Sequence, residues 1–228
     1  MPAPPPESLP AIVRAVGVSL ESTVMIANVS SGSLLNHSFT ETASARVPVR
    51  AAAVGLGVLI TAAAAQFTMP LPFTAVPFVL TPFAVMLVGA ALGSRLGFAT
   101  QVLYLAAGAA GLPVFAPSLV LPPGAARLIG PTGGYLLAYP VAAFVTGWLA
   151  ERGWDRRYFT SLASMLAGLA IIFIGGVSWL STLPGQTIGT AIAGGFIAHI
   201  GLDLIKAAVA AKVLPLAWKV YFTNTSKY

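Results

Sequence analysis

Long apolar runs separated by short polar breaks fill the chain from residue 49 onward. A helix that crosses a bilayer needs about 20 predominantly apolar residues, and several of the runs only just approach this length. Glycine, proline and charged residues mark the breaks. The length and periodicity of the runs predict an all-α integral membrane protein. We expect six transmembrane helices, over residues 51–66, 77–93, 96–111, 133–150, 159–183 and 187–216.

Residues 1–48 lack this pattern. They begin with MPAPPPES and are rich in serine and threonine, and their longest apolar piece is interrupted by Arg14. That piece is too short to span a bilayer. We interpret 1–48 as a poorly ordered tail and 49–228 as a six-helix membrane domain. Three alternatives stay open for the tail: an organelle-targeting peptide, against which its glutamates argue, an amphipathic helix on the membrane surface, and a start codon placed too early.

The composition supports a membrane protein and narrows its chemistry. Hydrophobic residues make up 57% of the chain and charged residues 8%, whereas soluble domains carry about 25% charged residues. The absence of cysteine excludes disulfide scaffolds and thiol-ligand metal sites. The formal net charge is +6, but the basic residues are scattered between apolar runs and do not form the patch that binds nucleic acid. We therefore expect no nucleic-acid partner.

The distribution of basic residues predicts the topology, because short cytoplasmic loops collect lysine and arginine. With the amino terminus inside, the outer connections 67–76, 112–132 and 184–186 hold Arg127 alone. We therefore expect a multi-pass protein of the cell membrane with both termini in the cytoplasm. The predicted cytoplasmic segments hold Arg46, Arg50, Arg95, Arg152, Arg156, Arg157, Lys212, Lys219 and Lys227.

One apolar run contains both an acid and a base. In the stretch 197–211, IAHIGLDLIKAAVAA, the residues His199, Asp203 and Lys206 stand at i, i+4 and i+7 and share one helical stripe. Ionisable side chains at membrane depth are costly and normally face a bundle interior or a water-filled cavity. The stripe therefore predicts a functional site. The alternatives are an Asp203–Lys206 ion pair that locks helices together, and a Lys206 side chain that extends to the membrane surface.

Two of the outer connections are rich in proline. The first, QFTMPLPFTAVPF at 66–78, is expected to be a stiff extended connector, because proline fixes its own φ and restricts the preceding residue. The second, GLPVFAPSLVLPPGAARLIGPTGGYL at 111–136, is long and apolar without helix caps. We interpret it as a lid-like outer loop between the third and fourth helices, folded over the mouth of the bundle.

The sequence GPTGGY at 130–135 leads into the fourth predicted helix. A helix start presents unpaired N–H groups and a positive dipole end, which suit a carboxylate or another anion. Gly133 and Gly134 would supply backbone donors, and Tyr135 a flat face with a hydroxyl. The alternative is a tight turn with an interfacial aromatic anchor. Arg127 is either a carboxylate partner beneath the lid or a solvated loop charge.

Small residues recur every fourth position along the first predicted helix. Ala53, Gly57, Thr61 and Ala65 form a stripe that lets a second helix backbone come close, as membrane helices do when they associate. The stripe could face a separate partner subunit or another helix of the same bundle.

Four strings, at consistent intervals, resemble the biotin-binding S component of energy-coupling-factor vitamin transporters. They are MPLPFTAVPF at 69–78, GLPVFA at 111–116, GPTGGYL at 130–136 and LDLIKA at 202–207. The resemblance covers about 50–216. It implies a six-helix membrane protein that binds biotin from the outer side and works with a transmembrane coupling protein and two ATP-hydrolysing subunits. It also favours a partner surface for the small-residue stripe of the first helix.

The chemistry of biotin fits this resemblance. The ureido ring has two N–H donors and one carbonyl acceptor, so Asp203 would accept from the ring and Lys206 would donate to its oxygen, beside His199. The valerate carboxylate would then lie near Tyr135 and Arg127 and the backbone of the two preceding glycines. The reverse orientation stays open. No catalytic residue, metal or cofactor is expected, and the chain lacks a GxxxxGK[ST] string, so ATP-driven steps must come from partners.

We therefore expect a substrate-binding membrane subunit for biotin uptake, which captures biotin outside and releases it inward. Three rivals remain. An S component for another small vitamin would share the same architecture. A membrane-embedded enzyme could use His199 and Asp203 as an acid/base pair, but no second cluster of polar residues marks a nucleophile or metal site. A purely structural bundle would bind no ligand.

Overall fold

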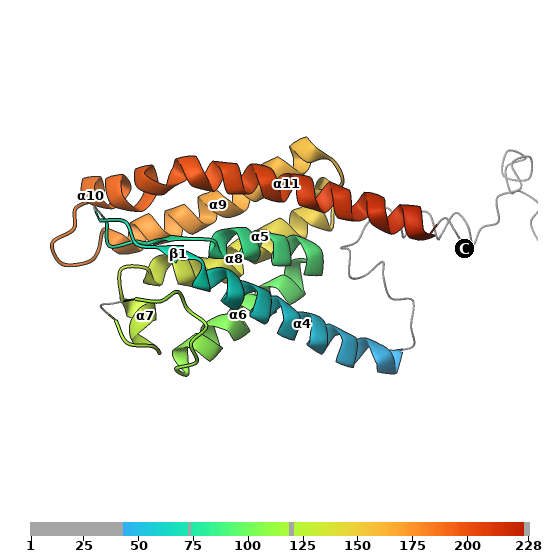
Figure 1. Ribbon diagram of the computed structural model, residues 1–228, viewed down its shortest axis with the longest axis horizontal. Helices are drawn as coiled ribbons and strands as arrows, with labels where there is room; N and C mark the ends of the chain where they lie inside the picture. The colour runs from blue at the N-terminus through green and yellow to red at the C-terminus, as the bar shows by residue number, and fades with distance from the viewer. Residues whose placement is uncertain (1–42, 73, 119–120, 226–228) are drawn as a thin grey trace, which may run out of the picture. The chain divides into compact units, whose positions relative to one another are not determined.

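The computed structural model describes residues 43–72, 74–118 and 121–225, which are mostly helical (Figure 1). Of the predicted tail 1–48, residues 1–42 lie outside the described residues. Residues 43–48 form the start of the first helix. The described elements are α4 (Ala43–Gln66), β1 (Thr68–Met69), β2 (Phe78–Val79), α5 (Thr81–Leu92), α6 (Ser94–Ala109), α7 (Ala126–Ile129), α8 (Gly133–Ala150), η1 (Trp154–Arg156), α9 (Tyr158–Leu180), α10 (Ile188–Ile192), η2 (Ala193–Ile197) and α11 (Ala198–Thr225).

Within this described part of the chain, four helices are long and apolar enough to cross a membrane: Val47–Gln66, Gly133–Ala150, Tyr158–Leu180 and Ile188–Lys219. Helices α5 and α6 occupy the second and third predicted spans but are shorter, with 12 and 16 residues. At 1.5 Å per residue, α5 is only about 18 Å long. The chain is therefore a multi-pass helical membrane protein with two shorter helices among its long ones.

Three predicted helix boundaries differ from the structure by four residues or more, and the first is the start of α4 at Ala43 instead of residue 51. The second helix begins at Thr81 and not at residue 77, because Phe78 and Val79 pair with β1 in a short antiparallel hairpin. Pro82 occupies the first turn of α5, where its fixed φ suits a helix start. The last helix continues through Pro215 to Thr225, beyond the predicted end at 216.

The helices run in alternating directions between two ends of the bundle. Helices α4 and α6 end, and α5 and α8 begin, at the end where the strands and α7 lie (Figure 1). We call this the cavity end. The opposite end, which we call the base, holds the α5–α6 turn and the α8–α9 connection. Helix α8 packs against α5, α6 and α9, and α11 packs against α9.

Glycines let the helix backbones meet near the base. A Cβ added at Gly89 would collide with the backbone of Ala143 on α8, and one at Gly97 would lie 2.8 Å from the Cα of Gly89. A Cβ at Gly147 would meet the backbone of the α5–α6 turn. Close packing of this kind holds helices together in a membrane, where lipid gives no hydrophobic driving force for their association. The turn itself is the single residue Gly93, whose φ of 85° favours glycine.

Two polar contacts also join elements at the base. The Glu151 carboxylate accepts from the Ser94 N–H at 2.7 Å and so satisfies a donor at the start of α6. The carboxylate of Asp155, in η1, accepts from Trp218 Nε1 at 2.6 Å and links the α8–α9 connection to α11. Asp155 is buried.

The small-residue stripe of α4 faces the chain's own helices. Gly57, Thr61 and Ala65 are buried, and a Cβ added at Gly57 would lie 2.9 Å from the Thr100 side chain of α6. Gln101 Nε2 donates to Thr61 Oγ1 at 3.2 Å. These three residues therefore pack within the same bundle, and contact of the stripe with a partner subunit stays a prediction. Their small size is needed inside the chain. Ala53, one turn earlier, is half-buried.

Candidate ligand-binding site

A cavity of about 610 Å³ lies at the cavity end, within the range of small-molecule pockets. Its wall is made by the segments before α5 and after α6 together with α8, α9 and α11. Most of the wall is apolar. The aromatic residues that line it are Phe78, Tyr104, Phe115, Tyr135, Tyr139 and Phe173.

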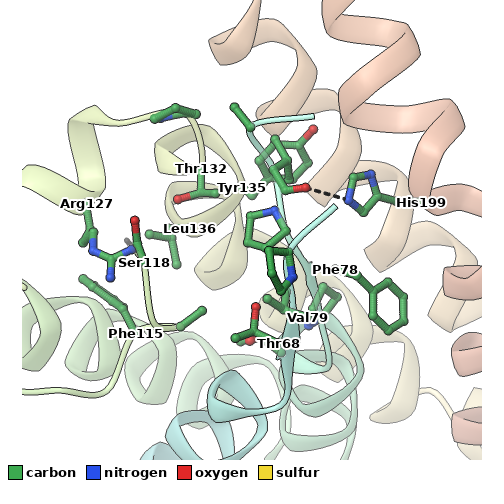
Figure 2. Close-up of a pocket in the computed structure, with 18 of the residues that line it drawn as sticks. Thr68, Phe78, Val79, Phe115, Ser118, Arg127, Thr132, Tyr135, Leu136 and His199 are labelled. Carbon is green, nitrogen blue, oxygen red and sulfur yellow. Dashed lines mark hydrogen bonds between the residues drawn. The ribbon is translucent and has the colours of Figure 1, made fainter. Parts of the chain in front are cut away.

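The charged groups of the cavity lie on separate elements. Asp203 and His199 reach it from α11, and Arg127 reaches it from α7. In Figure 2, Arg127 and His199 stand on opposite sides of the cavity. Arg127 Nε donates to the Pro122 carbonyl at 3.2 Å. Partial burial lowers the pKa of the Arg127 guanidinium, but arginine side chains keep their proton in proteins.

The acid and the base of α11 are paired. Asp203 is buried and forms an ion pair with Lys206 one turn further on. Lys206 Nζ also donates to the Val79 carbonyl at 2.7 Å and lies 4.1 Å from the centre of the Phe78 ring. The ammonium thus joins α11 to β2, with a cation–π contact added. Asp203 lines the cavity, whereas Lys206 is not among the residues that line it.

His199 makes a second contact to the same segment. Its Nε2 lies 3.1 Å from the Val76 carbonyl (Figure 2), and since a carbonyl only accepts, Nε2 carries the proton. The ring is buried. We call residues 74–79 the strap, because His199 and Lys206 attach its backbone to α11.

Tyr135 lies in the cavity wall, and its hydroxyl already has a hydrogen-bond partner within the chain. The hydroxyl donates to the Gly195 carbonyl of η2 at 2.8 Å, and the ring packs edge-on against Phe173 with centroids 6.5 Å apart. Thr74 Oγ1 donates to the neighbouring Gly194 carbonyl at 2.9 Å. Both contacts attach other elements to the start of the last helical segment.

The structure does not bring Gly133 and Gly134 to the cavity wall. The Gly133 N–H donates to the Gly130 carbonyl at 2.9 Å. A Cβ added at Gly133 would collide with the Leu128 backbone, and one at Gly134 with Trp179. These glycines therefore serve close packing at the start of α8.

Sequence reasoning missed several residues of the wall. Tyr139 stands four residues after Tyr135 on the same face of α8, and this spacing was the signal that could have found it. Tyr104 donates to the Val114 carbonyl at 3.2 Å, and its ring meets Phe115 edge-on at 5.4 Å. No signal in the sequence pairs Tyr104 with that loop. Among the described residues, no group of three or more His, Cys, Asp or Glu side chains could hold a metal ion.

The fold and the site define a multi-pass helical membrane protein with a ligand-sized, mostly apolar cavity at one end. The same fold is found in a solved structure, the S-component for biotin from an ECF-type ABC transporter, with a TM-score of 0.66 and 24% sequence identity. That comparison covers 79% of this chain and 95% of the other. Residues 36–223 match the model of the BioY family. This chain therefore belongs to the BioY family, and the resemblance found in its sequence is confirmed.

Two relatives agree with this assignment. The chain is 39% identical over 157 residues to the probable biotin transporter BioY of Pyrococcus horikoshii, covering 69% of this chain and 88% of the relative. It is 42% identical over 143 residues to the biotin transporter BioY of Thermotoga maritima, covering 63% of this chain and 81% of that protein.

Proposed function

We propose that this chain is the substrate-binding membrane subunit of a biotin uptake system. The observation that carries the proposal is the cavity of a BioY-family member with a buried carboxylate, Asp203, reaching it from α11 and a cation, Arg127, reaching it from α7. Biotin has a polar ureido ring at one end and a carboxylate at the other. The names of the related biotin transporters support the same substrate. The chain is a transporter subunit and not an enzyme.

In the proposed complex, the ureido N–H groups donate to Asp203 and the valerate carboxylate lies toward Arg127. An ammonium has three donors, and the contacts of Lys206 with Asp203 and Val79 use two of them. In the proposed complex the third donor binds the ureido oxygen. His199 and Tyr135 complete the wall around the ring.

The proposed architecture has six transmembrane helices, with α5 and α6 as the short pair, and a lid formed by 112–132. Phe115 and Leu121 from this connection line the cavity, which supports the lid. The base carries Arg95, Arg152 and other basic residues, so it is placed in the cytoplasm by the positive-inside rule. The cavity then opens outward and both termini are cytoplasmic.

Uptake against a gradient needs an energy source that this chain does not carry. Its sequence has no phosphate-cradling GxxxxGK[ST] string. We propose a transmembrane coupling protein and two ATP-hydrolysing subunits as its partners in the membrane.

The test is biotin binding to the purified full-length protein in detergent, with Asp203→Asn beside the wild type. We expect tight binding by the wild type and a loss of at least about 30-fold in the variant, since removing a charged hydrogen-bond partner in a dry site costs about 2 kcal/mol or more. Leu202→Ala, on the exposed side of α11, is the control and should bind normally, because it keeps that surface apolar.

Competition with other vitamins completes the test. If a different vitamin displaces biotin or binds more tightly, the subunit serves that vitamin. If well-folded wild type binds no biotin at all, the proposal is overturned. If biotin binding survives Asp203→Asn, the proposed function stands, but Asp203 is not the residue that binds the ureido ring.

A further inference from the structure

The last helical segment contains one π-helical turn, Ala193–Ile197, directly before α11. The N–H of Ala198 donates to the Ala193 carbonyl five residues earlier. A π turn accommodates one extra residue, and each residue of an α-helix turns by about 100°. The turn therefore sets the angle between the two parts of the segment that it joins. Such turns occur frequently at functional sites.

Two side chains from other elements bind the carbonyls of this turn. Tyr135 on α8 donates to Gly195 at 2.8 Å, and Thr74 in the strap donates to Gly194 at 2.9 Å. Thr74 Oγ1 also accepts from the Val76 N–H at 3.2 Å. Tyr135 and Thr74 both line the cavity, so the wall of the cavity and the π turn share the same two residues.

Glycines make room for these contacts. A Cβ added at Gly195 would collide with the Tyr135 hydroxyl, and one at Gly176 on α9 would collide with the Tyr135 ring. A Cβ at Gly194 would lie 3.0 Å from Thr74 Oγ1. The position of the Tyr135 side chain thus depends on small residues in two helical segments. This accounts for the paired glycines 194 and 195, which the sequence pattern left unexplained.

The strap is attached on both sides of the π turn. Thr74 binds within the turn, whereas the strap's carbonyls at 76 and 79 bind His199 and Lys206 beyond it. If the turn became regular α-helix, the two parts of the segment would rotate by about 100° relative to each other. The strap could not then keep both sets of contacts.

We propose that the π turn, held by Tyr135 and Thr74, sets the direction in which α11 presents Asp203 to the cavity. Tyr135 and Thr74 are then positioning residues for ligand binding, and the Tyr135 hydroxyl acts through Gly195 instead of through the ligand. The ligand part of this inference rests on the proposed function. The structural part does not.

The experiment measures two quantities on the purified full-length protein: biotin affinity, and hydrogen exchange of the backbone amides in 193–203 without biotin. Tyr135→Phe keeps the ring and removes the hydroxyl. We expect about tenfold weaker biotin binding, as for a lost buried hydrogen bond, and exchange at least severalfold faster across the π turn. Thr146→Val, which removes a buried hydroxyl far from the cavity, is the matched control and should change neither.

A second variant separates positioning from direct contact. Gly195→Ala keeps the Tyr135 hydroxyl but places a methyl group where that hydroxyl lies. This variant should therefore weaken biotin binding and speed hydrogen exchange across the π turn, as Tyr135→Phe does. The double variant should be no worse than either single one, because the missing hydroxyl leaves space for the new methyl group. That non-additivity is the signature of a shared contact.

Two results would overturn the inference. Weaker binding by Tyr135→Phe with unchanged exchange in the empty protein would make the hydroxyl a direct ligand. Faster exchange with unchanged affinity would make the contact purely structural. If the wild type binds no biotin, the proposed function fails, while the exchange data still decide whether Tyr135 holds the π turn.

Discussion

At the base of the bundle, α5, α6 and α8 meet backbone to backbone through glycines, whereas the strap and the π turn at the cavity end are joined to their neighbours by separate hydrogen bonds from side chains to carbonyls. Gly89 and Gly147 represent the first kind of contact. Tyr135, His199 and Lys206 represent the second. Close packing is a sum of many small attractions that are lost together, but single hydrogen bonds can break one at a time. We therefore expect the base to hold the fold and the cavity end to move.

The largest effect should follow from breaking the base. Gly89→Ala places a methyl group on the Ala143 backbone, and overpacking against backbone destabilises by about 2 kcal/mol or more. Thermal unfolding in detergent measures the loss. Gly55→Ala on α4 is the control, because nothing lies within 4 Å of its added Cβ. Equal stability of the two variants would contradict the role assigned to the base.

An intermediate effect should appear at the cavity end, on binding alone. Arg127→Gln should weaken biotin binding about threefold to fivefold, as expected of a partly exposed ion pair worth up to about 1 kcal/mol. Binding of the neutral carboxamide of biotin should not change, and neither should thermal stability. If the amide loses as much affinity as biotin does, Arg127 does not face the carboxylate.

The smallest effect concerns the polar contact at the base between Asp155 and Trp218. Burial raises the pKa of Asp155 above its ordinary value of 3.8, while the Trp218 hydrogen bond and Arg156 act in the opposite direction. Between the ordinary and the raised pKa the folded state binds more protons than the unfolded state, so stability declines as pH rises through that window and stays lower above it.

Asp155→Asn keeps an acceptor for Trp218 without the charge. We expect the variant to be more stable than the wild type at pH 7, because the neutral amide removes the buried charge. The gain should be about 1 kcal/mol or less, since the hydrogen bond from Trp218 loses its charge assistance. The difference should shrink as pH falls toward 4. Unfolding curves at the two pH values measure it, and a difference that grows at low pH would show that the charged form of Asp155 is the stabilising one.

The sequence predicted the helices better than the contacts between them. Apolar runs locate each helix, and the spacing of His199, Asp203 and Lys206 correctly placed them on one face. The sequence could not show that two of these residues bind backbone carbonyls of a segment more than 100 residues earlier. Every residue has a carbonyl, so the residue types do not reveal such a partner.

Two further features depend on three-dimensional proximity. The stripe of α4 signals close approach to some helix, but only the fold shows that Gly57 meets α6. The π turn depends on Tyr135 and Thr74, which lie far from it in sequence. A pair of glycines alone does not predict a π turn.

Residues 76 and 79 of the strap are held to α11 through their main-chain carbonyls, so these two hydrogen bonds do not depend on which side chains stand at those positions. Val76, Phe78 and Val79 nevertheless line the cavity. Ligand selectivity can therefore be redesigned at positions 76 and 79, by exchange of side chains of similar volume, while both hydrogen bonds to α11 are preserved. The side chains that contact the ligand can thus change while the main-chain hydrogen bonds that hold the strap stay the same.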